Sequence, residues 1–192
     1  MERLEDYARW GARIGMLTWN EENLLASGAG GDGEKGLTTL GKEAVRRMQR
    51  LGILPDVSHA GDGTFRDILR LAEGPVIASH SNCRALCDVR RNLTDDQLRA
   101  IRDTGGVVGI NLYRDFVGGT SMDALVAHIE HFLALDGEKT LCIGGDLDGS
   151  RTLAAGMRGM EDVPQLYRAL EKRGYGKALL EDIFWNNLRR LL

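Results

Sequence analysis

The sequence predicts an α/β fold built from repeated strand–helix units with parallel strands. Short apolar runs alternate along the chain with segments whose apolar residues lie three and four positions apart. Near-continuous apolar runs are typical of parallel strands covered by helices on both faces. Five such strands are expected to end near Trp19, His59, His80, Asn111 and Asp146. A closed (β/α)₈ barrel takes about 250 residues, so five units are too few to close one.

The composition indicates a water-soluble protein, with 43% hydrophobic and 28% charged residues. The 192 residues can bury one core, and a single domain over residues 1–192 is expected. The net charge is −3 and the basic residues are scattered, which excludes a typical nucleic-acid partner. No apolar run approaches the roughly 20 residues of a membrane segment, and residues 1–6 lack a signal-peptide core. We therefore expect a cytoplasmic location.

The first part of the chain predicts a helix over residues 3–12 and a strand over 14–18. Residues 27–36 contain five glycines and are expected to form a mobile active-site loop or a surface loop. A phosphate-binding loop is disfavoured because no strand leads directly into this stretch and no Gly-Lys-Ser/Thr closes it. Thr38 or Thr39 can cap the next helix. Its predicted inner face consists of Leu40, Ala44, Val45, Met48 and Leu51.

The rest of the chain continues the alternation of strands and helices. The capping box Thr94-Asp95-Asp96-Gln97 predicts a helix start. The further strands are expected at 53–58, 76–80, 107–112 and 140–145, and the further helices at 64–72, 94–102, 122–135, 163–173 and 176–192. His128 and His131 lie three apart within the predicted helix 122–135, beside acidic residues. We expect them on a solvated helix face, with a metal site as the weaker alternative.

The three cysteines do not suggest a disulfide framework, because their number is odd. Cys83 and Cys87 have the spacing of one helix face, and Cys142 lies in an apolar strand. Small buried hydrophobic side chains are the favoured interpretation for all three. A zinc site made of His80, Cys83 and Cys87 is the weaker alternative, because no spaced Cys-x-x-Cys pair accompanies it.

Two apolar runs end in Ser-His, at Ser58-His59 and at Ser79-His80, one strand–helix unit apart. Parallel strands carry their ligands at the carboxyl ends, so both imidazoles are expected to face one cavity, where they would suit zinc. Asp146 and Asp148 follow a later strand and could act as a base, a metal ligand or an orienting group. A serine nucleophile is disfavoured, because adjacent strand residues point to opposite faces.

Several motifs resemble those of the membrane dipeptidase (renal dipeptidase) family of zinc metallopeptidases. In chain order they are Leu17-Thr18-Trp19-Asn20-Glu21-Glu22-Asn23, Gly36-Leu37-Thr38 with Gly41-Lys42-Glu43, Asp56-Val57-Ser58-His59, Ala78-Ser79-His80-Ser81-Asn82, Arg90-Arg91-Asn92-Leu93-Thr94-Asp95-Asp96, Gly105-Gly106-Val107-Val108-Gly109-Ile110-Asn111 and Gly144-Gly145-Asp146-Leu147-Asp148-Gly149. The resemblance implies a TIM-type metal-dependent hydrolase barrel. It also implies hydrolysis of dipeptides at two zinc ions that a glutamate bridges.

The resemblance also implies roles for individual residues. His59 and His80 correspond to the two later histidine ligands of the metal ions. Arg91 corresponds to the arginine that binds the substrate carboxylate, and Asp146 to the catalytic acid/base. Three residues in the matching motifs are the expected substrate contacts. They are Trp19, which stands where the renal enzyme has a histidine, Asn20, and Tyr113.

The sequence departs from the family pattern at its beginning. The family has a His-x-Asp ligand pair on its first strand and a bridging glutamate after the third, but no histidine precedes His59 here. The chain therefore resembles the C-terminal five units of the barrel, and we expect a zinc-dependent dipeptidase-type hydrolase whose ligand set is partial. The alternative is a non-catalytic barrel remnant that acts as a binding or assembly module. An exposed strand edge would favour a homo-oligomer in that case.

Overall fold

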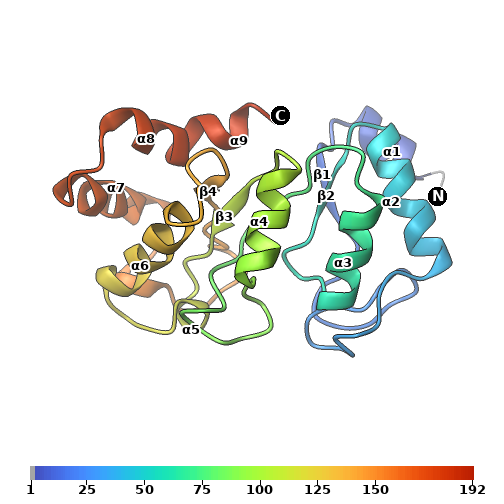
Figure 1. Ribbon diagram of the computed structural model, residues 1–192, viewed down its shortest axis with the longest axis horizontal. Coiled ribbons are helices and arrows are strands. Elements are labelled where there is room, and N and C mark those ends of the chain that lie inside the picture. The colour runs from blue at the N-terminus through green and yellow to red at the C-terminus, as the bar shows by residue number, and fades with distance from the viewer. Residues whose placement is uncertain (1–2) are drawn as a thin grey trace. The chain divides into compact units, whose positions relative to one another are not determined.

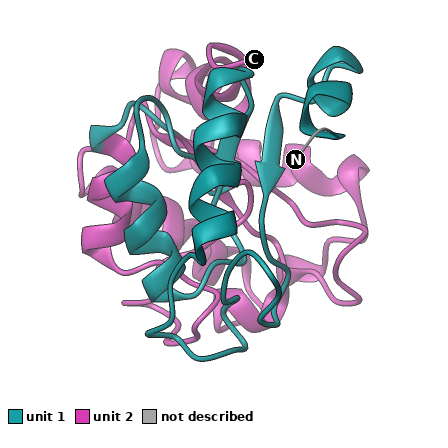
Figure 2. Cartoon of the chain, turned by 90° about the vertical axis from the view of Figure 1, so that its right-hand side faces the viewer, with its two compact units in different colours: residues 1–78, 103–106 teal, residues 79–102, 107–192 magenta. Residues whose placement is uncertain are grey.

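The structure is a computed structural model that describes residues 3–192. The chain divides into two compact units, which Figure 2 shows in teal and magenta. Unit 1 comprises residues 1–78 and 103–106, and unit 2 comprises residues 79–102 and 107–192. Each unit combines helices with one pair of parallel strands (Figure 1), which confirms the α/β class with parallel strands.

In unit 1 the strands β1 and β2 pair in parallel, with Ile14 opposite Leu54 and Met16 opposite Asp56. The elements of unit 1 are α1 (Arg3–Arg9), β1 (Ile14–Met16), α2 (Thr39–Arg50), β2 (Leu54–Asp56) and α3 (Asp62–Leu71). Helices α2 and α3 lie next to one another and beside the strands (Figure 1). The order of these elements is the order that the hydrophobic pattern predicts.

Helix α2 begins where the sequence predicts, since the Thr38 hydroxyl accepts a hydrogen bond from the Gly41 amide at 3.1 Å. Its buried face is rotated from the predicted one. Gly41, Ala44, Val45 and Met48 are buried, whereas Leu40 is 43% exposed, so its expected inward position is wrong. The cause is a close approach at Gly41, where a Cβ atom would lie 2.0 Å from the carbonyl oxygen of Leu25.

The predicted strand 76–80 is not formed as a strand in the described residues. Ile77 makes an isolated parallel bridge with Asp56. Its carbonyl accepts from the Val57 amide at 2.8 Å, and its own amide donates to the Pro55 carbonyl at 3.0 Å. The chain then passes from unit 1 to unit 2 at Ser79. Ile77 and Ala78 are bridge residues that belong to no strand, so four of the five expected strands are present among the described residues.

In unit 2 the strands β3 and β4 pair in parallel, with Val108 opposite Leu141 and Ile110 opposite Ile143. The elements are α4 (Asp95–Asp103, whose last residue belongs to unit 1), β3 (Val108–Ile110), α5 (Arg114–Val117), α6 (Met122–Leu133), β4 (Leu141–Ile143), the short 3₁₀ turns η1 (Ala154–Gly156) and η2 (Met160–Asp162), α7 (Val163–Lys172), α8 (Lys177–Glu181), the π-helical turn η3 (Asp182–Asn186) and α9 (Asn187–Arg189). The helix α5 was not predicted, because its single turn has no periodicity to detect.

The capping box before α4 is confirmed. The Thr94 amide donates to the Gln97 side-chain oxygen at 2.9 Å, and the Gln97 amide donates to the Thr94 hydroxyl at 3.2 Å. The predicted last helix is interrupted by η3. This turn accompanies the burial of Asn187, whose side-chain amide donates to the carbonyls of Glu138 at 2.7 Å and Leu141 at 2.8 Å.

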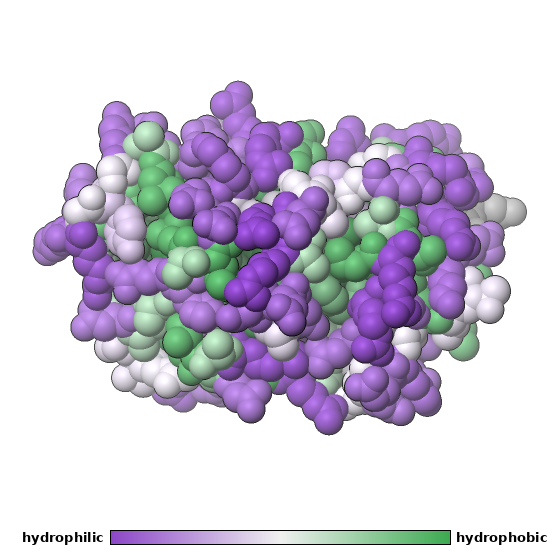
Figure 3. All heavy atoms as spheres, viewed as in Figure 1, coloured by the Kyte–Doolittle hydropathy of each residue, from purple (hydrophilic) through white to green (hydrophobic). Residues whose placement is uncertain are grey.

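Hydrophilic side chains are interspersed with smaller apolar areas on the face shown in Figure 3. The strands of β1–β2 and β3–β4 form no closed barrel within residues 3–192. Across the same described residues, every helix is too short or too polar to cross a membrane.

Candidate functional site

His59 follows β2 in unit 1 and is 8% exposed. Its Nδ1 atom lies 3.0 Å from the side-chain oxygen of Asn20. An amide oxygen can only accept, so Nδ1 carries the hydrogen and the lone pair of the neutral ring is on Nε2. The indole of Trp19 stands beside the imidazole, with 6.2 Å between the ring centroids, and Trp19 is 71% exposed. Three predicted site residues therefore lie together in unit 1.

A buried part of the glycine-rich stretch holds the backbone of His59. The Ala29 amide donates to the His59 carbonyl at 2.9 Å, and Gly28 makes an antiparallel bridge with Ala60. Ser27 is 1% exposed and Ala29 is 4% exposed. Residues 27–36 form a loop, as expected, but residues 27–29 are buried and do not lie at the surface. The short side chains let this stretch pack closely, although it contains few apolar groups.

His80 follows Ser79 in unit 2 and is half-buried. The Ser79 hydroxyl lies 2.7 Å from His80 Nδ1, so the expectation that adjacent residues point apart fails here. The alternation of a strand does not apply, because these two residues form a bend. The backbone is fixed by closely packed glycines, since a Cβ at Gly109 or Gly144 would lie 2.1 Å or 1.8 Å from the Ser79 carbonyl oxygen.

Asp146 lies beyond β4, with its backbone in the left-handed region at φ 52°. Its carboxylate accepts a hydrogen bond from the side-chain amide of Asn111 at 3.2 Å. Asn111 is fully buried, and Asn82 bonds its backbone twice, donating to its carbonyl at 2.9 Å and accepting from its amide at 3.0 Å. Asn111 was noted at a strand end but not predicted as a site residue. The signal was a polar side chain directly after a buried strand.

Arg91 lies in unit 2 with its guanidinium carbon 5.2 Å from the centroid of the Phe116 ring. The Phe116 ring in turn packs edge to face against Tyr113, with centroids 4.8 Å apart. The Tyr113 hydroxyl donates to Asp115 at 2.8 Å, and this hydrogen bond raises the pKa of the phenol. Arg91 and Tyr113, both predicted substrate contacts, are thus joined through the ring of Phe116.

His128 lies on α6 and is completely buried, so its expected position on a solvated face is wrong. Its Nδ1 accepts from the Cys83 amide at 3.1 Å, and its Nε2 donates to the Val117 carbonyl at 3.0 Å. Burial lowers the pKa of this imidazole. His131 is half-buried, with Nε2 2.8 Å from Asp95. Acidic neighbours in the sequence misled the prediction, because the packing of a helix face depends on distant residues.

Cys83 and Cys142 are buried, as expected, while Cys87 is partly exposed. The spacing of Cys83 and Cys87 does not place them on a helix. They close a single turn, in which the Cys87 amide donates to the Cys83 carbonyl at 3.2 Å. Desolvation raises the pKa of both thiols.

The sequence profile of the membrane dipeptidase family, peptidase family M19, matches residues 1–192. The chain belongs to the membrane dipeptidase family. It is 36% identical over 187 residues to an uncharacterized protein from the pqqA 5′ region of Klebsiella pneumoniae, covering 91% of this chain and 69% of that protein. It is 32% identical to an uncharacterized dipeptidase of Schizosaccharomyces pombe, covering 98% of this chain and 48% of the relative.

Solved structures agree with this membership. The fold matches a metallopeptidase from Rhodobacter sphaeroides, which was crystallised with a phosphinate mimic of the dipeptide L-Ala-D-Ala, at a TM-score of 0.92 and 29% identity. The match covers 99% of this chain and 57% of that one. The chain thus spans between about half and about two thirds of the length of these relatives. In sequence and in fold the chain is therefore similar to metallopeptidases of this family.

The candidate metal ligands of this chain fit a metal site only in part. Imidazole nitrogen is a zinc ligand, and metal-binding histidines commonly engage their second nitrogen in a hydrogen bond, as His59 and His80 do. A catalytic zinc site usually has three protein ligands. Within residues 3–192, no group of three or more His, Cys, Asp or Glu side chains is arranged to hold a metal ion.

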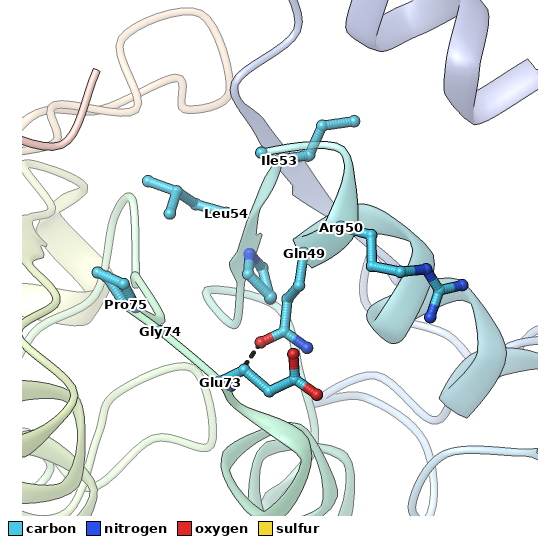
Figure 4. Close-up of a pocket in the computed structure, with 9 residues that line it drawn as sticks. Gln49, Arg50, Ile53, Leu54, Glu73, Gly74 and Pro75 are labelled. Carbon is cyan, nitrogen blue, oxygen red and sulfur yellow. Dashed lines mark hydrogen bonds between the residues drawn. The ribbon is translucent and has the colours of Figure 1, made fainter.

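Two cavities lie away from these side chains. One, of about 250 Å³, opens in unit 1 at the beginning of β2, between Gln49, Leu54 and Pro75 (Figure 4). There the Gln49 side-chain oxygen accepts from the Glu73 amide at 2.7 Å. His59 follows the other end of β2, where parallel strands carry their chemistry. The second cavity, of about 450 Å³, is an apolar groove in unit 2 between β4 and the C-terminal turns.

Proposed function

We propose that this chain is part of a zinc-dependent dipeptidase and that His59 and His80 are metal ligands. The observation that carries the proposal is the bond at Nδ1 of each imidazole, to Asn20 at 3.0 Å and to Ser79 at 2.7 Å. Such a bond orients a ligating ring. The side-chain oxygen of Asn20 also selects the tautomer of His59, because it can only accept, whereas the Ser79 hydroxyl can donate or accept. Family membership supplies the reaction class. In the family site two zinc ions act together, and we infer a partial ligand set in this chain.

The chain's own residues would perform the remaining tasks of dipeptide hydrolysis. A bound metal supplies Lewis acidity toward the scissile carbonyl and toward water. Asp146, held by Asn111, would move protons as the acid/base. Arg91, whose guanidinium rests on Phe116, would bind the substrate carboxylate. Trp19, Asn20 and Tyr113 are the proposed substrate contacts.

The architecture belongs to the same proposal. The parallel pairs β1–β2 and β3–β4 support an interpretation of residues 1–192 as one domain, the C-terminal five units of a TIM-type hydrolase barrel. The substrate class follows from the family and from the Rhodobacter sphaeroides relative, which binds a mimic of L-Ala-D-Ala. We therefore propose small dipeptides as substrates.

Metal binding and hydrolysis should be measured on the same preparation. The chain is expected to bind zinc weakly in a calorimetric titration and to hydrolyse L-Ala-D-Ala slowly or not at all, because two imidazoles are one ligand short of a catalytic site. His59→Ala and His80→Ala should each reduce the binding further, whereas His131→Ala should not. Equal binding by all four proteins would overturn the ligand assignment. Two tightly bound zinc ions together with rapid hydrolysis would overturn the partial ligand set.

A non-catalytic binding or assembly module is the second candidate. It is favoured by the apolar groove between β4 and the C-terminal turns, because Trp185, 64% exposed, and Leu192, 58% exposed, line it. Sedimentation at increasing concentration tests this candidate. A homo-oligomer that dissociates in Trp185→Ser would support it, and a monomer at all concentrations would argue against assembly.

A further inference from the structure

We propose that Asn20 is a positioning residue that fixes His59 in the tautomer with its hydrogen on Nδ1. The tautomer follows from the 3.0 Å contact, since the Asn20 side-chain oxygen accepts and the ring nitrogen opposite it must donate. The lone pair is then on Nε2, the atom that we assign to the metal. The assignment of Nε2 to the metal rests on the proposed function, whereas the tautomer follows from the contact with Asn20 alone.

The backbone of Asn20 is held by the glycine-rich stretch. The Gly30 amide donates to the Asn20 carbonyl at 2.8 Å. A Cβ atom at Gly28 would lie 2.3 Å from the Trp19 carbonyl oxygen and 2.5 Å from that of Asn20. Distances below about 3.0 Å are not tolerated by backbone atoms, so only glycine fits at this position. The glycine-rich stretch therefore holds the backbone of Asn20, a role that does not involve phosphate binding.

The same stretch also holds His59. The Ala29 amide, between these two glycines, donates to the His59 carbonyl at 2.9 Å, and the Thr18 hydroxyl donates to the same carbonyl at 3.4 Å. Residues 28–30 therefore bond the backbones of both Asn20 and His59. Because both backbones are fixed to one short segment, the side-chain bond between them needs little further ordering.

His128 provides a contrast within the chain. Its Nδ1 accepts from the Cys83 amide, and its Nε2 donates to the Val117 carbonyl. A neutral His128 therefore has the opposite tautomer to a neutral His59. The two rings should give distinct imidazole nitrogen signals, and His128 is an internal reference for the measurement.

The test is the ¹⁵N NMR spectrum of the imidazoles of the metal-free chain at about pH 8, above the ordinary histidine pKa of about 6.5. His59 is expected to show hydrogen on Nδ1 and His128 to show it on Nε2. Asn20→Asp retains an acceptor and should keep the His59 signature. Asn20→Leu removes the acceptor and should convert His59 to the mixture of tautomers of an unconstrained imidazole. Ser79→Ala, which removes the partner of His80, should leave His59 unchanged.

A His59 signature that is unchanged in Asn20→Leu would overturn the proposal. Hydrogen on Nε2 of His59 in the unsubstituted chain would also overturn it, and that measurement does not require any variant to fold. A zinc titration of the same proteins separates this proposal from the proposed function. Weaker binding in Asn20→Leu, by about tenfold, with recovery in Asn20→Asp would support both. A chain that binds no zinc but shows the tautomer change would refute the metal assignment and leave the positioning role of Asn20 supported.

Discussion

The side-chain amide of Asn111 donates to the carboxylate of Asp146 across 3.2 Å, linking the residue after β3 to a residue three positions beyond β4. The other end of the same amide, its oxygen, accepts from the Tyr113 backbone amide at 2.7 Å. Asn111 therefore connects the proposed acid/base with the segment that carries a proposed substrate contact. Asn111 itself is fully buried, while Asp146 and Tyr113 are half-buried.

Asn111→Ala is expected to lower the free energy of unfolding by about 1 to 3 kcal/mol, because the half-buried backbone amide of Tyr113 loses its acceptor and the Asp146 carboxylate loses a donor. Urea unfolding followed by circular dichroism measures the change. Asn186→Ala is the matched control, since Asn186 is exposed and its side-chain amide donates to Asp182 at 3.1 Å. Equal midpoints for the two variants would contradict the structural role of Asn111.

His128 predicts a loss of stability in weak acid. Desolvation lowers the pKa of the folded imidazole below the ordinary value of about 6.5 that applies to the unfolded chain. The unfolded state therefore binds a proton that the folded state does not, and the stability contribution falls as the pH drops below about 6.5. Urea midpoints should be measured from about pH 8 down to about pH 5, the range in which histidines change charge. They should decrease less steeply in His128→Gln than in the unsubstituted chain. In His131→Gln the dependence of the urea midpoint on pH that His128 contributes should remain. Its loss in His131→Gln would contradict the assignment of this pH dependence to His128.

Local sequence signals predicted those features that neighbouring residues determine. The capping box at Thr94 and Gln97 is formed as written in the sequence, because both of its bonds join residues three apart. The start of α2 at Thr38 has the same local origin. The parallel pairing was predicted correctly from the strand–helix alternation, since a helix between two strands returns the chain to run in the same direction.

Features that depend on distant residues could not be predicted. The burial of His128 is due to Cys83 and Val117, which lie 45 and 11 positions away. The bridge at Ile77 pairs it with Asp56, 21 positions earlier in the chain. The role of Asn20 beside His59 joins residues 39 positions apart, so the sequence indicated Asn20 only through its motif.

Trp19 predicts an aromatic contribution to substrate binding. In a Trp10→Phe, Trp185→Phe background, Trp19 is the one remaining tryptophan of the sequence. Its fluorescence should change on titration with an apolar dipeptide. Stacking on an aromatic ring contributes about 1 kcal/mol, so Trp19→Leu should weaken binding about fivefold in calorimetry. Trp10→Leu, which alters another exposed indole, should bind normally. Equal affinity in Trp19→Leu and the unsubstituted chain would remove Trp19 from the substrate contacts.

Gly144 and Gly33 provide a matched pair of glycine substitutions. A Cβ at Gly144 would lie 1.8 Å from the Ser79 carbonyl oxygen, whereas a Cβ at Gly33 would have no atom of the described residues within 4 Å. Neither glycine has a positive φ in the left-handed range, so the steric contact distinguishes them. Gly144→Ala should therefore lower the free energy of unfolding by about 2 kcal/mol or more, since backbone atoms must shift.

Gly33→Ala should leave the stability unchanged or raise it slightly, by up to about 1 kcal/mol, because alanine restricts the unfolded chain. Both changes can be measured by urea unfolding under one set of conditions. His80 adds a local readout, because its Nδ1 lies 2.7 Å from the hydroxyl of the same Ser79. Gly144→Ala should shift the imidazole ¹⁵N signals of His80, and Gly33→Ala should not. A Gly144→Ala protein with normal stability and unshifted His80 signals would show that Ser79 does not depend on the close approach of the Gly144 backbone.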